Sequence, residues 1–148
     1  MKNAARLREW IARALIGLVF GVNLACALDF IARPQLYMAG YELSGEVGRV
    51  VIIGYGILFL MWQVPYTFAL YHPGKFRVSL IQAIIMQTIG LVGETLLLGT
   101  IPMEHAVLHG SISRFIYFDG GGLVLLIVAF FLVYRRNISQ NEENHELV

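Results

Sequence analysis

Residues 10–31 read WIARALIGLVFGVNLACALDFI, an apolar run that carries charge only near its two ends, at Arg13 and Asp29. An α-helix needs ~20 mostly apolar residues to cross the hydrocarbon core of a bilayer, and this run has that length. Its Leu, Ile, Val and Phe residues stand in unbroken stretches, without the alternation of a strand in a membrane β-barrel. The run therefore predicts a transmembrane α-helix.

Three more runs of the same kind follow, at about residues 47–71, 78–101 and 112–134. Prolines mark the breaks between the runs, because proline disfavours helix at the residue before it and cannot donate a backbone hydrogen bond. Pro65 is different, since it falls inside the second run, where a kink is expected instead of a break. We predict an all-α fold, a four-helix transmembrane bundle that forms a single domain over residues 1–136.

Composition supports this class of protein. Hydrophobic residues make up 57% of the 148-residue chain and charged residues only 14%, whereas soluble domains carry about 25% charged residues. Four spans of this length leave no room for a separate soluble domain. The remaining residues, 137–148, form a polar, acidic tail.

The placement of Lys and Arg predicts the orientation, because cytoplasmic loops carry the excess of these residues. The eight on one side are Lys2, Arg6, Arg8, Arg13, Lys75, Arg77, Arg135 and Arg136. The three on the other side are Arg33, Arg49 and Arg114. We therefore expect both termini and the tail to be cytoplasmic (N-in/C-in), in a multi-pass protein of the cell membrane, most simply a bacterial inner membrane.

The first run also has features of a signal peptide, with a basic start and a small-residue sequence at Ala25-Cys26-Ala27. Two features favour a retained span instead. Arg13 interrupts the apolar stretch, and the stretch continues to Ile31 beyond the possible cleavage site.

Charged side chains gather toward the predicted outer ends of the spans. Glu94 and Asp119 are each seven residues from a predicted outer end, about 10 Å deep at 1.5 Å per residue. Asp29, Arg49 and Arg114 lie nearer to the outer ends of the first, second and fourth spans, respectively. Ionisable residues within spans are costly and are functional-site candidates by default. We take these five residues as a candidate polar cluster to which all four spans contribute.

Small residues accompany this cluster. Gly17 and Gly21 precede Asp29 at steps of four, and Gly90 lies between Gln87 and Glu94 on one helical face. Small residues at such spacing let helices approach closely. The fourth span adds three glycines directly after Asp119, where a neighbouring helix or a ligand could come close; they are Gly120, Gly121 and Gly122.

Two interpretations of the cluster stay open. The acids and arginines could neutralise each other and tie the helices together, an architectural role. Alternatively they line a polar pocket that opens outward, with at least one carboxyl protonated because the acids outnumber the arginines. Tyr37 and Tyr41 lie near span ends and are predicted to be interfacial anchors.

Other chemistry is weakly indicated. His105 and His109 stand four residues apart, a spacing that can bind metal on a helix, but a closed zinc site needs four ligands. Cys26, the single cysteine, excludes an internal disulfide and fits a packing role. No phosphate loop, nucleophile elbow or metalloprotease helix is present in the sequence. We expect neither a metal nor a cofactor, and catalytic residues stay unknown.

A family resemblance rests on three features of the first half of the chain. These are RALIGLVFG at residues 13–21, the loop that contains Pro34, and GYGIL at residues 54–58. In these features the chain resembles the DoxX-like small four-helix integral membrane proteins. The resemblance implies a link with quinone or thiosulfate oxidation or with redox homeostasis, and it assigns no site residues.

Three functions remain open at this point. The first is a non-catalytic bundle that binds lipid or quinone or serves as an accessory subunit of a larger membrane complex. The second is a membrane enzyme acting on a quinone or isoprenoid lipid, with Glu94 and Asp119 as proton donor and acceptor. The third is a small proton-coupled transporter, although small multidrug exporters have a weak Lys/Arg bias and this chain has a strong one. Expected partners are membrane lipids, an amphiphile or complex subunits, and not nucleic acid.

Overall fold

The computed structural model describes the backbone of residues 2–145 and the side chains of residues 3–134. Every regular element in this part of the chain is helical. In chain order the elements are α1 (Lys2–Ala32), α2 (Gln35–Met38), the 3-10 helix η1 (Ala39–Tyr41), α3 (Gly45–Tyr71), α4 (Arg77–Leu98) and α5 (Ala106–His145). The long helices α1, α3, α4 and α5 are each long and apolar enough to cross a membrane. The prediction of an all-α protein with four long helices that could cross a membrane is thereby confirmed.

The helix ends differ from the predicted span ends. α1 begins at Lys2, well before the apolar run, and α5 continues to His145, through most of the predicted tail. Residues 146–148 of that tail lie outside the described residues. α4 ends at Leu98, three residues earlier than predicted, because Gly99 to His105 form turns around Pro102. Hydropathy locates an apolar run, whereas a helix can extend beyond it into polar sequence.

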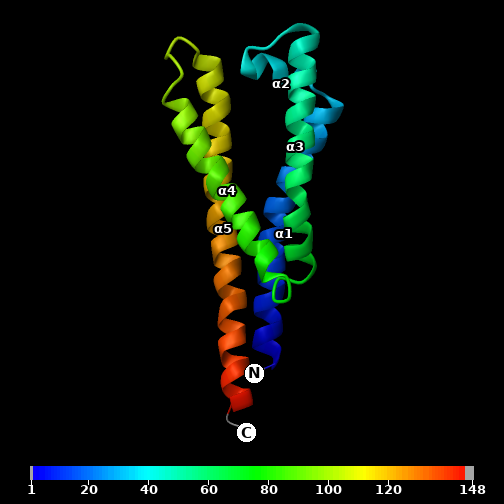
Figure 1. Ribbon diagram of the computed structural model, residues 1–148, viewed down its shortest axis with the longest axis vertical. Helices are drawn as coiled ribbons and strands as arrows, with labels where there is room; N and C mark the ends of the chain where they lie inside the picture. The colour runs from blue at the N-terminus through cyan, green and yellow to red at the C-terminus, as the bar shows by residue number, and fades with distance from the viewer. Residues whose placement is uncertain (1, 146–148) are drawn as a thin grey trace.

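The four long helices form two pairs that diverge like the arms of a V (Figure 1). α1 packs along α3 in one arm, and α4 packs along α5 in the other. α1 also packs against α5, and α3 packs against α4. Both chain termini lie beyond the end where the arms meet, which we call the closed end (Figure 1). The short helix α2 lies at the opposite end, which we call the flared end.

The core near the closed end consists of apolar and mostly modest side chains. Its fully enclosed members include four alanines, which let the helices approach closely. Larger side chains fill the space between them, with Leu80 and Leu126 both 0% exposed. The buried cluster is Ala12, Ile16, Val19, Tyr66, Ala69, Leu80, Ala83, Leu126, Ala129 and Val133.

Large apolar side chains also cover the outside of the bundle, as a surface in contact with lipid requires. Leu18 and Leu28 on α1, and Ile89 and Leu96 on α4, are each at least half exposed. The protein thus presents an apolar exterior along both arms, in keeping with a polytopic membrane protein.

Gly56 brings α3 directly against α1. A Cβ atom at this position would lie 2.7 Å from Cγ1 of Ile31 and 2.8 Å from the carbonyl oxygen of Ala27. The predicted contact stripe on α1 is only partly used, because Gly17 faces the Leu70 side chain at 3.4 Å whereas nothing lies within 4 Å of Gly21. Gly56 on α3 therefore allows α1 to come close, whereas Gly21 on α1 makes no such contact.

Pro65 lies inside α3 and does not end the helix, as predicted. Two polar side chains beside it bond to the helix backbone. Gln63 Nε2 donates to the Phe59 carbonyl at 2.9 Å, and Thr67 Oγ1 donates to the Gln63 carbonyl at 2.9 Å. Backbone groups within a membrane need such partners, which is why Ser, Thr and amide side chains accompany proline in spans.

Candidate functional site

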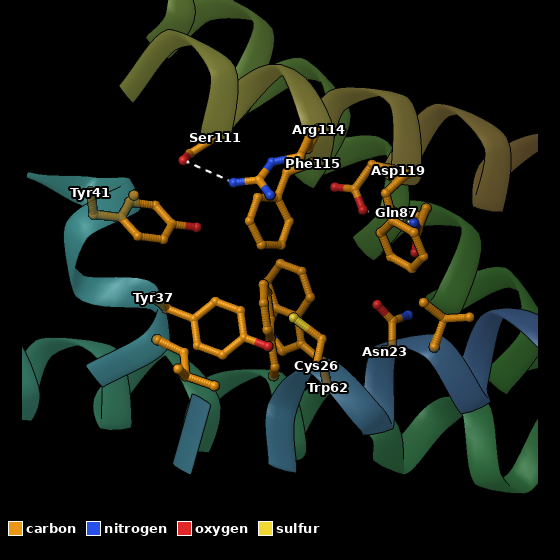
Figure 2. Close-up of a pocket in the computed structure, with 15 residues that line it drawn as sticks. Asn23, Cys26, Tyr37, Tyr41, Trp62, Gln87, Ser111, Arg114, Phe115 and Asp119 are labelled. Carbon is orange, nitrogen blue, oxygen red and sulfur yellow. Dashed lines mark hydrogen bonds between the residues drawn. The ribbon is translucent and has the colours of Figure 1, made fainter. Parts of the chain in front are cut away.

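A cavity of about 290 Å³ lies between the arms, toward the flared end (Figure 2). Each of the four long helices contributes to its lining, and so do α2 and η1. No predicted span could form this cavity alone, because the lining residues extend in sequence from Val22 to Asp119.

Six aromatic residues line the cavity. They are Tyr37, Tyr41, Phe59, Trp62, Phe115 and Phe118. Phe30, which is 1% exposed and is not itself in the lining, contacts aromatic rings from four other elements, α2, η1, α3 and α5. Its ring centroid is 4.6 Å from that of Tyr37, 5.8 Å from that of Phe59 and 6.2 Å from that of Phe115. These are favourable separations for aromatic pairs, so Phe30 holds the wall together.

One end of the cavity is polar because of a hydrogen-bonded chain across three helices. The Tyr66 hydroxyl on α3 donates to Gln87 Oε1 on α4 at 2.5 Å. Gln87 Nε2 in turn donates to Asp119 Oδ1 on α5 at 2.8 Å. Asn23 on α1 also lines this end (Figure 2). The side-chain amide of Gln87 orients both of its neighbours, since it accepts a hydrogen bond from Tyr66 and donates one to Asp119.

Two predicted glycines make room for this chain. A Cβ atom on Gly90 would collide with Asp119 Oδ2, so the carboxyl occupies the space that a side chain on α4 would fill. A Cβ atom on Gly122 would lie 2.7 Å from Gln87 Nε2. Gly120 has only Leu91 nearby, at 3.8 Å, and nothing lies within 4 Å of Gly121. The glycines after Asp119 therefore differ, and Gly122 is the one that faces the polar chain.

A second polar region of the lining contains Arg114 and Ser111 on α5. Arg114 Nη2 donates to Ser111 Oγ at 3.2 Å. In the part of the chain with described side chains, no carboxylate lies within 4.0 Å of this guanidinium. Gly40 of η1 lies against both groups, because a Cβ atom there would be 2.9 Å from Ser111 Oγ and 3.9 Å from Arg114 Nη2.

The segment α2–η1 folds back over the cavity and supplies Tyr37 and Tyr41 to its wall. It is fastened to α1 by Tyr37, whose hydroxyl donates to Asp29 Oδ2 at 3.0 Å. It is fastened to the α4–α5 loop at its other end, where Glu42 Oε2 is 2.6 Å from His105 Nδ1. Glu42 itself has a φ of 53°, a left-handed conformation that ends η1 and turns the chain toward α3.

Both tyrosines of this segment are affected by their surroundings. Burial raises the pKa of Tyr41 above its usual value. Burial and the hydrogen bond to Asp29 raise the pKa of Tyr37. Both phenols are therefore protonated donors at neutral pH.

The structure separates the candidate polar cluster into local groups. Asp29 pairs with Arg33, which directly follows the end of α1, and with Tyr37. Arg49 pairs with Glu46 on its own helix, with Nε to Oε2 at 2.9 Å and Nη2 to Oε1 at 2.5 Å. Neither Asp29 nor Arg49 lines the cavity, whereas Arg114 and Asp119 both do.

Glu94 lies close to the cavity but not in its lining. Its Oε2 atom is buried and has no hydrogen-bond partner. The Asp119 carboxyl lies against Gly90, about one helical turn before Glu94 on α4, and the two carboxyls are close enough to interact electrostatically.

The two candidate metal ligands point to other partners. His105 contacts Glu42, and His109 Nε2 lies 3.0 Å from the Ile101 carbonyl oxygen. Among residues 3–134, no group of three or more His, Cys, Asp or Glu side chains could hold a metal ion. Cys26, interpreted from the sequence as packing, lines the cavity.

Sequence reasoning did not select several lining residues. Gln87 was noted only as a partner on the Gly90 face, and Asn23, Trp62 and Ser111 carried no signal beyond being polar or aromatic in a span. Tyr37 and Tyr41, predicted to be interfacial anchors, belong to the cavity wall.

In comparisons with known proteins, no family model, curated protein or solved structure matches this chain.

Proposed function

We propose that this small polytopic membrane protein binds an amphiphilic ligand, a lipid or a quinone, in the cavity between its arms. The observation that carries the proposal is the composition of the cavity, with six aromatic rings in the wall and polar groups confined to two regions. Ligand sites are mostly apolar, with a few placed polar groups that orient the ligand. Residues 13–21 and 54–58, which resemble the DoxX-like proteins, add quinones to the candidate ligands.

The proposed orientation places the flared end and its cavity on the outer side of the membrane. Eight Lys and Arg residues lie toward the closed end and three toward the flared end, and the richer side is cytoplasmic. Both chain ends lie at the closed end (Figure 1). A ligand would then enter from the outer leaflet or the outer aqueous phase.

The pairing of charges favours a binding site over a purely architectural role. Buried ions that tie helices together would be expected to pair across helices. Asp29 and Arg49 instead form ion pairs with residues three or four positions away, and Arg114 faces the cavity. Side-chain hydrogen bonds that join the long helices run through the neutral amide of Gln87, to Tyr66 and to Asp119.

The decisive experiment is native mass spectrometry of the purified protein, with lipidomics of what remains bound. Cys26→Phe fills the cavity, and Leu28→Phe adds a ring to the lipid-facing side of the same helix, where Leu28 is 50% exposed. We expect the wild type and Leu28→Phe to retain an amphiphile that Cys26→Phe loses. Equal lipid content in all three proteins would refute the proposal.

A membrane enzyme acting on an amphiphile is the second candidate. The buried, unpartnered Oε2 of Glu94 favours it, because such a carboxyl near a ligand cavity can exchange a proton. Glu94→Gln and Asp119→Asn would then leave accumulation and ligand content unchanged, and would abolish the phenotype that a deletion produces. Loss of accumulation in both variants would instead assign the carboxyls to folding.

A further inference from the structure

The guanidinium of Arg114 is a cation that lines the cavity, and no described carboxylate lies within 4.0 Å of it. The other arginines near the flared end each contact an acid close by in sequence, Arg33 with Asp29 and Arg49 with Glu46. Arg114 has only the Ser111 hydroxyl, at 3.2 Å. Figure 2 shows its head group directed into the cavity above Phe115. An arginine in this setting can still accept a negatively charged ligand.

The surroundings of Arg114 form a small donor site. The Ser111 hydroxyl, 2% exposed as a residue, supplies a second group that can donate a hydrogen bond. Gly40 closes over both, and a side chain there would collide with Ser111 Oγ, at 2.9 Å. Tyr41, a protonated phenol, lines the same cavity. A guanidinium beside hydroxyl donors matches the oxygen atoms of a carboxylate or a phosphate, which arginine can bind through two parallel hydrogen bonds.

The polar region around Asp119 makes the two ends of the cavity chemically different. Asp119 lies five residues after Arg114 on α5, ~7.5 Å further along the helix axis. Arg114 is the only cationic side chain among the lining residues that the structure describes, so a negative head group is directed to Arg114. The aromatic wall between these regions, with Phe115 and Phe118, suits an apolar chain or ring.

We infer that the ligand is an amphiphile with an anionic head, a carboxylate or a phosphate, which binds Arg114 and Ser111 at the flared end of the cavity. This inference rests on the proposed binding function and goes further by fixing the charge and the position of the head group. A neutral amphiphile, such as a quinone, could accept hydrogen bonds from Arg114 but would lack the attraction between opposite charges.

Trp62 in the cavity wall provides a direct measurement. Trp10→Phe leaves Trp62 as the single tryptophan of the chain. Bromine atoms quench tryptophan fluorescence at short range, so a dibrominated stearic acid reports its own binding. Its methyl ester has the same chain without the charge. Both are titrated into the full-length protein in detergent, at an alkaline pH that ionises the acid.

We expect the acid to saturate quenching at about a tenfold lower concentration than the ester, because a charge-assisted hydrogen bond is worth that much. Arg114→Gln should remove the difference by weakening the acid alone. Arg49→Gln is the matched control, since it removes an arginine that is paired on α3 and does not line the cavity. Ester binding in Arg114→Gln shows that the variant is folded.

The outcomes distinguish a wrong assignment of the head group from the absence of any amphiphile site. Saturable quenching with equal affinity for acid and ester in the wild type would overturn the anionic head while leaving the amphiphile site intact. Quenching that does not saturate, and that Cys26→Phe leaves unchanged, would overturn the proposed function itself. Should Arg114→Gln fail to accumulate, Arg114→Lys keeps the charge but lacks the planar fork, and it should show a reduced preference for the acid.

A second pair of ligands distinguishes the sources of the anion. A lysophosphatidate without bromine carries a phosphate on one chain and relieves quenching when it displaces the brominated acid, and inorganic phosphate carries the charge without a chain. Displacement of the acid by the lysophosphatidate supports an amphiphilic phosphate as an equivalent ligand. Displacement by millimolar inorganic phosphate alone would show that the site binds free anions, and would overturn the requirement for an apolar chain.

Discussion

The closed end and the flared end of the bundle are held together by different forces. At the closed end, alanines and branched apolar residues such as Ile16 and Leu126 pack without exposure. At the flared end, aromatic rings and side-chain hydrogen bonds link the arms around a cavity. Removing side-chain atoms from a close-packed core destabilises the fold, whereas the flared end already contains unfilled space. The comparison separates residues whose loss should reduce stability from residues whose loss should reduce binding.

Removing volume from the closed end should have the largest effect. Leu126→Ala should lower the free energy of unfolding by about 2–5 kcal/mol, because it opens a cavity in a packed core. The measurement is reversible unfolding in mixed micelles of dodecyl sulfate. Leu96→Ala, at a position that is 68% exposed to lipid, is the control and should change little. Equal effects of the two substitutions would show that the closed end is not a packed core.

Adding volume between α1 and α3, inside one arm, should have the next largest effect. Gly56→Ala places a methyl group 2.7 Å from Cγ1 of Ile31 and 2.8 Å from a backbone oxygen, which cannot move aside cheaply. We expect a loss of about 1–3 kcal/mol in the same unfolding measurement. Gly54→Ala, which meets nothing within 4 Å, should leave stability unchanged or raise it slightly. A neutral Gly56→Ala would mean that α1 and α3 are further apart than described.

Breaking the polar chain at the flared end should have a smaller effect on stability and a clear effect on the site. Gln87→Leu removes the amide that bonds both the Tyr66 hydroxyl and Asp119 Oδ1, and leaves Tyr66 the longer contact to the Ala83 carbonyl, at 3.4 Å. Hydrogen bonds between membrane helices average about 0.6 kcal/mol, so the loss should be near 1 kcal/mol. A double-mutant cycle with Tyr66→Phe measures the coupling, and strict additivity would argue against the chain.

Alkaline pH should produce the smallest effect. The raised pKa values of Tyr37 and Tyr41 favour the protonated phenols in the folded state. Their contribution to stability is complete below the usual tyrosine pKa of about 10, and it is lost as pH rises toward the folded values. Tyr41→Phe should flatten this dependence, as measured by unfolding midpoints between neutral and strongly alkaline pH. An unchanged slope would contradict the burial of the Tyr41 phenol.

The fold could be predicted because the bilayer imposes a length. Each apolar run is long enough to span, and breaks such as His72-Pro73-Gly74-Lys75 separate the helices. The ends were less predictable, since helix formation at Lys2 does not depend on hydropathy. The three-residue shift at Leu98 follows from local turns that hydropathy does not register.

The site was only partly predictable. Asp119, Arg114 and Gly90 were selected from depth and small-residue spacing, and they lie in or against the cavity. Asp29 and Arg49 were selected by the same criterion, but Arg33 and Glu46 at helical spacing already offered each a local partner. Tyr37 reaches the cavity because α2 folds back, and that depends on tertiary packing that no local pattern encodes.

The distribution of the cavity lining over all four long helices has a consequence for biogenesis. Ribosomes deliver the spans to the membrane in order, so α1 and α3 can pair while α5 is still unsynthesised. At that stage the Tyr37 side of the wall lacks Arg114, Phe115 and Asp119, and no binding site exists. Capture of the proposed ligand would therefore mark completion of insertion, and a bound amphiphile would protect finished chains, not nascent ones, from membrane proteases.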